Sequence, residues 1–294
     1  MIFALPIILS AISFEGLLRK IPNDYSYKKD YLDRNSRTVE ILFLGNSHIY
    51  YGIDPKYINR KSFNAAGVSQ SLNYDLAIIK KYETKWDSLK CIVLPIDYLS
   101  LYTTLESGIE SWRVKNYSIY YDININHNIL YNTELFTNSF IANLTNAYNY
   151  YYKHNVNTNC SLAGWGTKHQ GSSHQDLDAT GKSAAERHTM STSAYLAENL
   201  ETVSAIIKFA KSKNVSILFF TCPVYKSYSE NLDSNQLNNT IRKADSLVRT
   251  YGNASYINLL NDKDFTAADF YDADHLNDIG AKKLTLKIYG FLKK

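Results

Sequence analysis

Short apolar runs alternate with amphipathic segments from Thr38 to the end of the chain. Nearly continuous apolar runs are typical of strands that are buried on both faces. They predict strands over residues 39–44, 62–66, 91–95, 215–221 and 255–259, and apolar residues at helical spacing predict helices over 71–82, 196–210, 237–248 and 281–292. Strands that alternate with helices form a parallel sheet covered on both faces. Residues 38–294 are therefore predicted to adopt a flavodoxin-like, three-layer α/β/α fold.

The alternation stops between about residues 97 and 195. This stretch holds an Asn- and Tyr-rich run over 117–155 and is too long for a simple loop. Its apolar residues keep a rough helical spacing at Leu135, Phe136, Phe140, Leu144 and Tyr148. We expect a helical insertion that lies over the strand ends.

The first fourteen residues are uncharged and almost wholly apolar. Residues 1–20 are predicted to form a hydrophobic anchor or signal-like helix, and the charged residues 21–37 a tether to the α/β domain. A spanning helix needs about 20 apolar residues, and the basic leader of a secretory signal is missing here. Met1 is therefore either an internal start or the beginning of a buried first helix.

An anchored chain would face the outside of the cytoplasm in a bacterial cell envelope, and its membrane contact would be the N-terminal helix. The alternative is a cytoplasmic protein. The basic residues Arg19, Lys20, Lys28 and Lys29 follow the apolar segment and favour the opposite orientation.

Composition narrows the choice of partners. The net charge of +4, from 32 basic and 28 acidic residues, gives no indication of a nucleic-acid partner. Three cysteines, an odd number without metal-ligand spacing, exclude a disulfide scaffold. His169, His174 and Cys160 also match no standard metal site, so neither a metal nor another cofactor is expected.

The first polar segment at a strand end is Gly45-Asn46-Ser47-His48. Ligands of parallel α/β folds bind at the carboxyl ends of the strands, and a glycine lets the chain turn so that the next hydroxyl faces the crevice. Ser47 is thus a candidate nucleophile. The alternative is an ordinary turn made of common turn residues.

The second segment, residues 271–280, precedes the last helix and contains Asp272, Asp274 and His275. A histidine accepts a serine proton when its other ring nitrogen is held by a carboxylate. Asp272, three residues before His275, can reach back to it, whereas Asp274 is expected to point away. The alternative is a helix-capping loop with a surface histidine.

The third segment, residues 63–70, follows the second strand, and its small residues expose backbone N–H groups that can stabilise an oxyanion. It contains Asn64, Ala66, Gly67 and Gln70. The alternative is a plain strand-to-helix loop.

Together these segments resemble the SGNH (GDSL-like) hydrolase family. The resemblance implies that Ser47 is the nucleophile, His275 the general base and acid, and Asp272 its orienting carboxylate. The amide of Ser47 and that of Ala66 or Gly67 would form the oxyanion hole, and Asn46, His48, Asn64, Gln70 and Asp97 would line the pocket.

The sequence is most similar to membrane-anchored SGNH-like proteins of bacterial cell-surface polymer modification. This similarity rests on Gly52-Ile53-Asp54-Pro55 and on Asp274-His275-Leu276-Asn277, which Gly280-Ala281 follows.

Two positions depart from the family pattern. Asn64 is followed by Ala65 and Ala66, with glycine only at Gly67. Asp97 stands where the family has an asparagine, and a carboxylate there repels a developing oxyanion unless it is protonated or turned away. Either the oxyanion hole then lacks its side-chain donor, or Asn116 or Asn124 of the insertion supplies one.

The resemblance implies a serine ester hydrolase that removes acyl groups from a carbohydrate or lipid through an acyl-enzyme. Two alternatives stay open. One is an O-acyltransferase for a surface polysaccharide that works with a membrane partner. The other is a non-catalytic glycan-binding protein on a degenerate SGNH fold.

Overall fold

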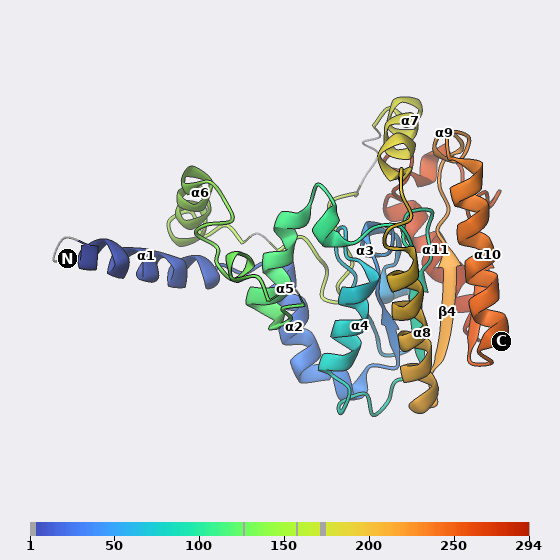
Figure 1. Cartoon of the computed structure of the whole chain (residues 1–294), viewed down its shortest axis with the longest axis horizontal. Helices are drawn as coiled ribbons and strands as arrows, with labels where there is room; N and C mark the ends of the chain where they lie inside the picture. Colours follow the sequence, from blue (N-terminus) through green and yellow to red (C-terminus); the bar gives the residue numbers. More distant parts are fainter. Residues whose placement is uncertain (1–3, 126, 157, 171–174, 294) are drawn as a thin grey trace. The chain divides into compact units, whose positions relative to one another are not determined.

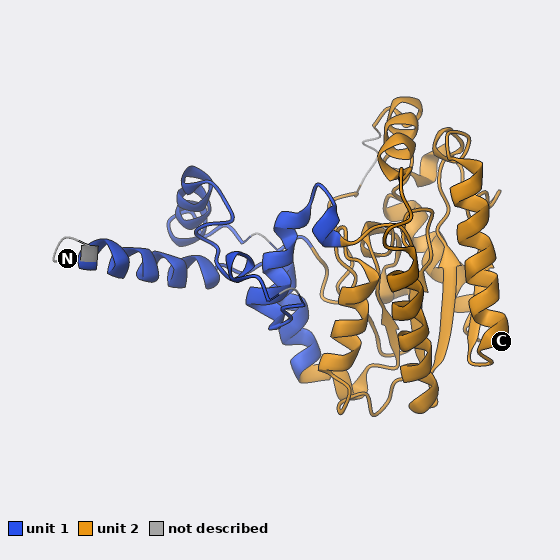
Figure 2. Cartoon of the chain, viewed as in Figure 1, with its two compact units in different colours: residues 1–33, 105–159 blue, residues 34–104, 160–294 orange. Residues whose placement is uncertain are grey.

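The computed structural model describes residues 4–125, 127–156, 158–170 and 175–293. It divides into two compact units (Figure 2). Unit 1 combines residues 1–33 with 105–159, and unit 2 combines 34–104 with 160–294. Residues 160–195, which the sequence analysis assigns to the insertion, thus belong to unit 2.

Unit 2 is built on a five-stranded sheet in the order β2-β1-β3-β4-β5. The strands are β1 (Ile41–Phe43), β2 (Ser62–Asn64), β3 (Cys91–Pro95), β4 (Ser216–Thr221) and β5 (Ala254–Asn258). All neighbouring strands pair in parallel, and Leu42 of β1 lies opposite Phe63 and Ile92. This order is that of the flavodoxin-like doubly wound folds. The predicted fold class is confirmed.

Helices cover both faces of this sheet (Figure 1). α4 (Leu72–Lys81) contacts α8 (Leu196–Ser212), while α3 (Ser47–Gly52) contacts α11 (Asp278–Phe291). α10 (Ser234–Thr250) packs against β5. The remaining helices of the unit are α7 (Leu177–His188), α9 (Lys226–Ser229) and the 3-10 turns η1 (Ser36–Thr38), η2 (Pro55–Tyr57) and η6 (Ala267–Asp269).

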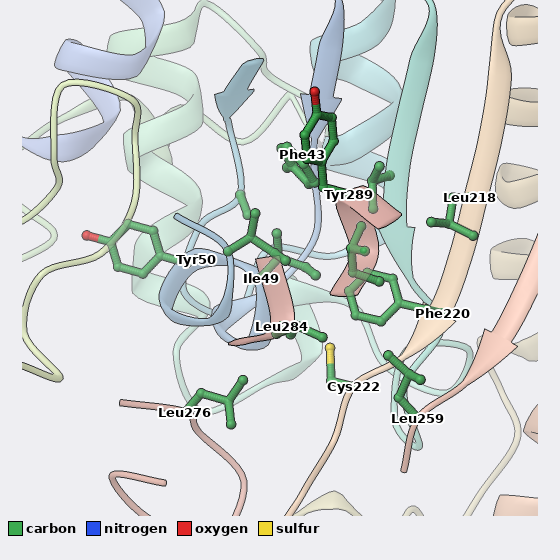
Figure 3. Close-up of a cluster of buried hydrophobic side chains, with 14 of the residues drawn as sticks. Phe43, Ile49, Tyr50, Leu218, Phe220, Cys222, Leu259, Leu276, Leu284 and Tyr289 are labelled. Carbon is green, nitrogen blue, oxygen red and sulfur yellow. The ribbon is translucent and has the colours of Figure 1, made fainter. Parts of the chain in front are cut away.

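The core on the α3 and α11 face is a single apolar cluster (Figure 3). Phe43, Leu218 and Phe220 of the sheet meet Ile49 of α3 and Leu284 of α11 there. Burying one such side chain contributes about 1.5 to 3 kcal/mol. The residues that alternate with these in β1, β3 and β4 are buried as well, so these three strands are apolar on both faces, whereas β5 is only partly buried.

α7 and α9 have no counterpart in the sequence-based prediction. α7 carries small residues where other helices carry large apolar ones, and its Gly181, Ala184 and Ala185 are its buried positions. A side chain at Gly181 would collide with Ser227 of α9. Close packing of small residues therefore holds these two helices together, and the apolar spacing that predicts a helix is missing.

Unit 1 is helical in the part that the structure describes. It contains α1 (Ala4–Arg19), α5 (Val114–Tyr121), α6 (Phe140–Tyr151), the start of α2 (Asp24–Asn35) and the 3-10 turns η3 (Leu105–Ser107), η4 (Ser111–Arg113) and η5 (Ile129–Asn132). α6 begins later than the apolar spacing from Leu135 suggests, because Ser139 caps its first turn.

α2 occupies most of residues 21–37, which the sequence analysis interprets as a tether. The side chain of Asn23 accepts hydrogen bonds from the amides of Tyr25 and Ser26, which starts the helix. Tyr25 packs edge-on against Tyr117 of α5, and Leu32 is fully buried. The buried residues of α2 are Lys28 and Leu32, which are too few in this charged segment to give an apolar period.

Within unit 1, α1 and α6 pack on each other (Figure 2). The rings of Phe14 and Phe140 meet edge to face at 6.1 Å, and the Tyr151 hydroxyl donates to the Leu17 carbonyl at 2.8 Å. Glu15, the first charge of α1, accepts hydrogen bonds from two backbone amides at residues 134 and 135.

Much of the apolar surface of these two helices is exposed to solvent: Leu5, Ile7, Ile8, Leu9 and Ile12 of α1, and Phe140, Ile141, Leu144 and Tyr148 of α6. None of the described helices is both long enough and apolar enough to cross a lipid bilayer.

Candidate active site

The turn after β1 presents Ser47 at the carboxyl end of the sheet. Gly45 has a φ of +117°, which only glycine adopts without strain, and a side chain there would collide with Pro95. The Asn46 side chain then caps α3 by accepting a hydrogen bond from the amide of His48 at 2.9 Å. Ser47 is thereby the first residue of α3, and it is partly exposed.

Ser47, His275 and Asp272 form one hydrogen-bonded chain. His275 Nε2 lies 2.8 Å from Ser47 Oγ, and His275 Nδ1 lies 3.0 and 3.1 Å from the two carboxylate oxygens of Asp272. The carboxylate requires a hydrogen on Nδ1, so the lone pair of Nε2 faces the serine hydroxyl. The structure thus brings together the three residues that the sequence analysis selects.

The loop that carries Asp272 is fixed by local hydrogen bonds. One carboxylate oxygen of Asp272 accepts the amides of Asp274 and His275, at 3.2 and 2.8 Å. Asn277 then caps α11 by accepting the amides of Ile279 and Gly280. The segment is therefore a helix-capping loop and a carrier of the histidine at the same time.

Asp274 does not point away from the site, as was expected. Its side chain is only 4% exposed, and its carboxylate oxygens lie 3.6 Å from His275 Nδ1 and 3.6 Å from His48 Nε2. The turn made by Asp272 directs it inward. His275 thus faces two carboxylates. Burial lowers its pKa, but Asp274 and then Asp272 outweigh burial, and the pKa is raised.

His48 is fully paired and buried beside the nucleophile. Its Nδ1 lies 2.8 Å from Asp97, and its ring meets that of His275 edge to face at 5.3 Å. Burial disfavours its charged form, but Asp97 and Asp274 raise the pKa of His48 well above the ordinary value. Both ring nitrogens of His48 therefore face carboxylates, which favour its protonated form.

Asp97 is turned toward donors. His48 and the Asn46 side chain donate to one oxygen at 2.8 and 3.3 Å, and the Cys222 amide donates to the other at 2.8 Å. Although burial raises the pKa of this carboxyl, His48 and the other donors lower it below the usual value. Of the two outcomes expected for Asp97, protonated or turned away, the lowered pKa argues against the protonated one.

The two predicted oxyanion donors of the second loop are engaged elsewhere. The amide of Ala66 donates to the Asn64 side chain at 3.1 Å, and the amide of Gly67 donates to the Gly45 carbonyl at 3.1 Å. Asn64 also donates to two carbonyls of α3 and its C-cap, at Ile49 and Ile53. These residues therefore hold the nucleophile turn in place, and the structure does not offer their amides as free donors.

The Ser47 amide is different. Among the described residues it has no backbone or side-chain acceptor. It opens α3, where a helix has unpaired N–H groups. It is therefore the predicted oxyanion donor that the fold leaves available. Asn116 and Asn124 of the insertion belong to unit 1.

Asp75, which the sequence analysis did not select, lies beneath the nucleophile turn. One of its oxygens accepts the Gly45 amide at 2.9 Å and the Gln70 side chain at 2.6 Å. Burial raises the pKa of Asp75 to about 7, and its two donors only partly offset this. Gln70 thus supports the turn through Asp75 and does not line an open pocket on its own.

His169 is stacked beside the catalytic histidine. Its ring lies between those of Tyr51 and Tyr271, with centroid distances of 3.7 and 3.9 Å, and 5.5 Å from that of His275. Burial and His275 lower the pKa of His169 to about 4, so the ring is neutral. Tyr51, His169 and Tyr271 therefore form an aromatic wall. His174 lies outside the described residues.

Two groups of side chains bring possible metal ligands together: His48, Asp97 and Cys222, and His48, Asp274 and His275. In the first, burial and then Asp97 raise the pKa of the Cys222 thiol, whereas a metal binds the thiolate. In the second, His275 already uses both ring nitrogens for Ser47 and Asp272. Both groups of side chains are therefore better suited to proton transfer.

Comparisons with known proteins give distant matches. Residues 136–279, just under half of the chain, match the model of a family described as "Protein of unknown function (DUF1574)". This match includes Asp272 and His275 but not Ser47. No curated protein matches the chain.

Among solved structures, the chain is similar to a candidate platelet activating factor from Streptococcus pneumonia, with 12% identity, a TM-score of 0.44 and 99% of each chain covered. It is also similar to a candidate acylhydrolase from Bacteroides fragilis, with 8% identity and a TM-score of 0.43, over 90% of this chain and 96% of the other. Both similarities are remote, and the site is argued from its own geometry.

Proposed function

We propose that the protein is an SGNH-type serine ester hydrolase that removes acyl groups from a carbohydrate or a lipid. The observation that carries the proposal is the continuous chain from Ser47 Oγ through His275 to Asp272, with distances of 2.8 and 3.0 Å. Nucleophile, base and orienting carboxylate are the three parts of an activated serine.

In the proposed reaction, Ser47 Oγ attacks the ester carbonyl while its proton moves to His275 Nε2. The carbonyl oxygen becomes an oxyanion, and the Ser47 amide stabilises it. The intermediate collapses to an acyl-serine, and His275 gives its proton to the departing alcohol. Water then attacks the acyl-serine, with His275 again taking the proton, and releases the carboxylic acid and Ser47.

Asp272 keeps the imidazole in the productive orientation throughout. It holds the hydrogen on Nδ1 and stabilises the imidazolium that forms in each step. The Asp97 carboxylate accepts hydrogen bonds from His48, the Asn46 side chain and the Cys222 amide, and these donors reduce the negative charge that it presents to the oxyanion. These contacts weaken the main objection to catalysis that the sequence raises.

We also propose that unit 1 holds the protein at a membrane surface. α1 and α6 expose large apolar side chains in one unit, for example Ile7 at 71% and Ile141 at 76%. Exposed apolar surface of this extent is typical of protein or membrane contacts. Uncharged residues fill α1 up to Glu15, as a lipid environment requires.

The test of the hydrolase proposal is hydrolysis of p-nitrophenyl acetate by the full chain and by Ser47→Ala. Loss of the serine should lower kcat/KM by at least about 10³-fold, because only binding and the oxyanion donor remain. The matched control is Ser193→Ala, an exposed serine in unit 2 that should leave the rate unchanged. Equal rates for wild type and Ser47→Ala would refute the proposal.

A further inference from the structure

A second chain of interacting side chains, which carries charges, lies next to the hydrogen-bonded chain of Ser47, His275 and Asp272. It runs from Asp97 after β3, through His48 of α3, to Asp274 in the loop before α11. The Asp97–His48 distance is 2.8 Å, and the His48–Asp274 distance is 3.6 Å. Each of these three side chains is only 4% exposed, so the charges interact with little screening by water.

We propose that Asp97, His48 and Asp274 act as positioning residues that set the orientation and the basicity of His275. Asp274 is the link, because its two carboxylate oxygens face His275 and His48 separately, each at 3.6 Å. The kinetic part of this inference rests on the proposed function. Its structural part does not.

The geometry gives the two inner residues opposite effects on His275. Asp274 attracts a proton to His275, whereas the His48 imidazolium, with its ring centroid 5.3 Å away, repels one. His275 and then His48 keep Asp274 ionised in a buried place where a lone carboxylate would take up a proton. Without His48, His275 keeps the attraction of Asp274 and Asp272 and loses the repulsion of the imidazolium. Without Asp274, it keeps Asp272 together with the repulsion of His48.

Other titratable groups face this chain from each neighbouring element. Cys222 follows β4, and burial together with Asp97 raises the pKa of its thiol. His188 ends α7 and bonds to the Tyr228 hydroxyl of α9 at 2.8 Å, and burial lowers its pKa to about 4. Arg187 lies beside it in α7. His169 and Tyr51 contact His275 from the other side. None of these groups is a carboxylate, so Asp97 and Asp274 are the acidic partners of His48.

The test compares His48→Gln with Asp274→Asn in the full chain. His48→Gln should raise the pKa of His275 and move the acidic limb of the kcat/KM profile to higher pH by about one unit, because neutral His275 is the active base. Asp274→Asn should move the limb by a similar amount to lower pH. The double variant should return close to wild type. Asp178→Asn, an exposed carboxylate on α7, is the matched control and should leave the limb in place.

Nuclear magnetic resonance titration of the histidine rings measures the same shifts without any substrate. In the wild type, both ring nitrogens of His48 should stay protonated at a pH well above the ordinary pKa of histidine. In Asp97→Asn, the His48 ring should lose its second proton near neutral pH. If a variant fails to fold, the wild-type spectrum still shows whether the His48 ring is protonated. Shifts of the same sign in His48→Gln and Asp274→Asn, or a neutral His48 ring in the wild type, would overturn the inference. If ester hydrolysis is absent but the His275 titration shifts in opposite directions in His48→Gln and Asp274→Asn, the proposed function is wrong and the inference about Asp97, His48 and Asp274 is supported.

Discussion

The two units differ in the side chains that they bury and expose. Unit 2 buries charged side chains at the strand ends and pairs them, so that Asp97, His48 and Asp274 are each only 4% exposed. Unit 1 leaves large apolar side chains on its surface, with Ile7 and Ile141 more than 70% exposed. Buried charges are costly unless they are paired, and exposed apolar groups are costly in water.

Each unit therefore carries a feature that a fold alone does not need. A hydrophobic core would stabilise unit 2 without buried imidazole and carboxylate groups, so we infer that these serve proton transfer. A soluble unit 1 would place Ile141 inward, so we infer that its apolar surface is covered in the cell. We therefore infer that unit 2 carries out the chemistry and that unit 1 attaches the protein to a surface. Variants in unit 2 should leave this attachment unchanged, and variants in unit 1 should leave ester hydrolysis unchanged.

The largest effect is expected from His275→Ala in unit 2. The variant loses the base that takes the serine proton, so kcat/KM for a soluble ester should fall by at least about 10³-fold. Binding to vesicles that contain anionic lipid, measured by flotation, should be unchanged. A loss of both properties together would contradict the separation of the two units.

The next effect distinguishes the two carboxylates that face His275. Asp272→Asn should lower kcat by about 10²- to 10⁴-fold, because an amide can hold the wrong tautomer of the ring. Asp274→Asn should cost much less and show mainly as a shift of the pH profile, since its oxygen lies 3.6 Å from Nδ1 and Asp272 lies at 3.0 Å. Steady-state kinetics on both variants over about pH 5 to 9 would check the order. A larger loss of kcat in Asp274→Asn would exchange the roles of the two residues.

The third prediction concerns the stability of unit 2. The folded state holds the Asp75 proton up to about pH 7, whereas the unfolded chain releases it near pH 4. The contribution of Asp75 to the free energy of unfolding should therefore fall as the pH rises between these values, by up to about 4 kcal/mol, and stay constant above them. Asp75→Asn keeps the oxygen that accepts from Gly45 and Gln70, and it removes this fall.

Urea unfolding of wild type and Asp75→Asn at several pH values measures this difference. The stability of the variant relative to wild type should increase from about pH 4 to pH 7. A difference that does not change with pH would mean that Asp75 is ionised throughout.

The smallest effect is expected from Ile141→Glu in unit 1. A charge on an exposed apolar position of α6 should weaken vesicle binding by about tenfold, while ester hydrolysis stays at the wild-type rate. Leu286→Glu is the matched control in unit 2, because Leu286 is also exposed on a helix. Equal vesicle binding by Ile141→Glu and Leu286→Glu would remove α6 from the proposed membrane surface.

The central strands of the sheet of unit 2, β1, β3 and β4, could be predicted because they are apolar on both faces. The bounds of β3, for example, agree residue by residue with the apolar run from Cys91 to Pro95. α2 and α7 could not be predicted in this way. α2 is a charged helix with few buried residues, and α7 packs through Gly181 and small neighbours. Their stability comes from tertiary contacts that leave no apolar period.

The candidate triad could be selected from sequence because each part follows a local rule. Ser47 follows a strand and a glycine, and Asp272 reaches His275 across one turn. The roles of Asp274, Asp97 and Asp75 depend on partners from other elements, for example His48 for Asp97 and Gly45 for Asp75. Such pairs are distant in sequence, and no spacing rule connects them.

The central claim is that Ser47 is an activated nucleophile in the folded protein. A fluorophosphonate probe reacts with activated serines, and peptide mapping by mass spectrometry then identifies the modified residue. We predict stoichiometric labelling of Ser47 in the wild type, and none in His275→Ala under the same conditions. An unlabelled wild-type protein, or a label on any other serine, would contradict the claim.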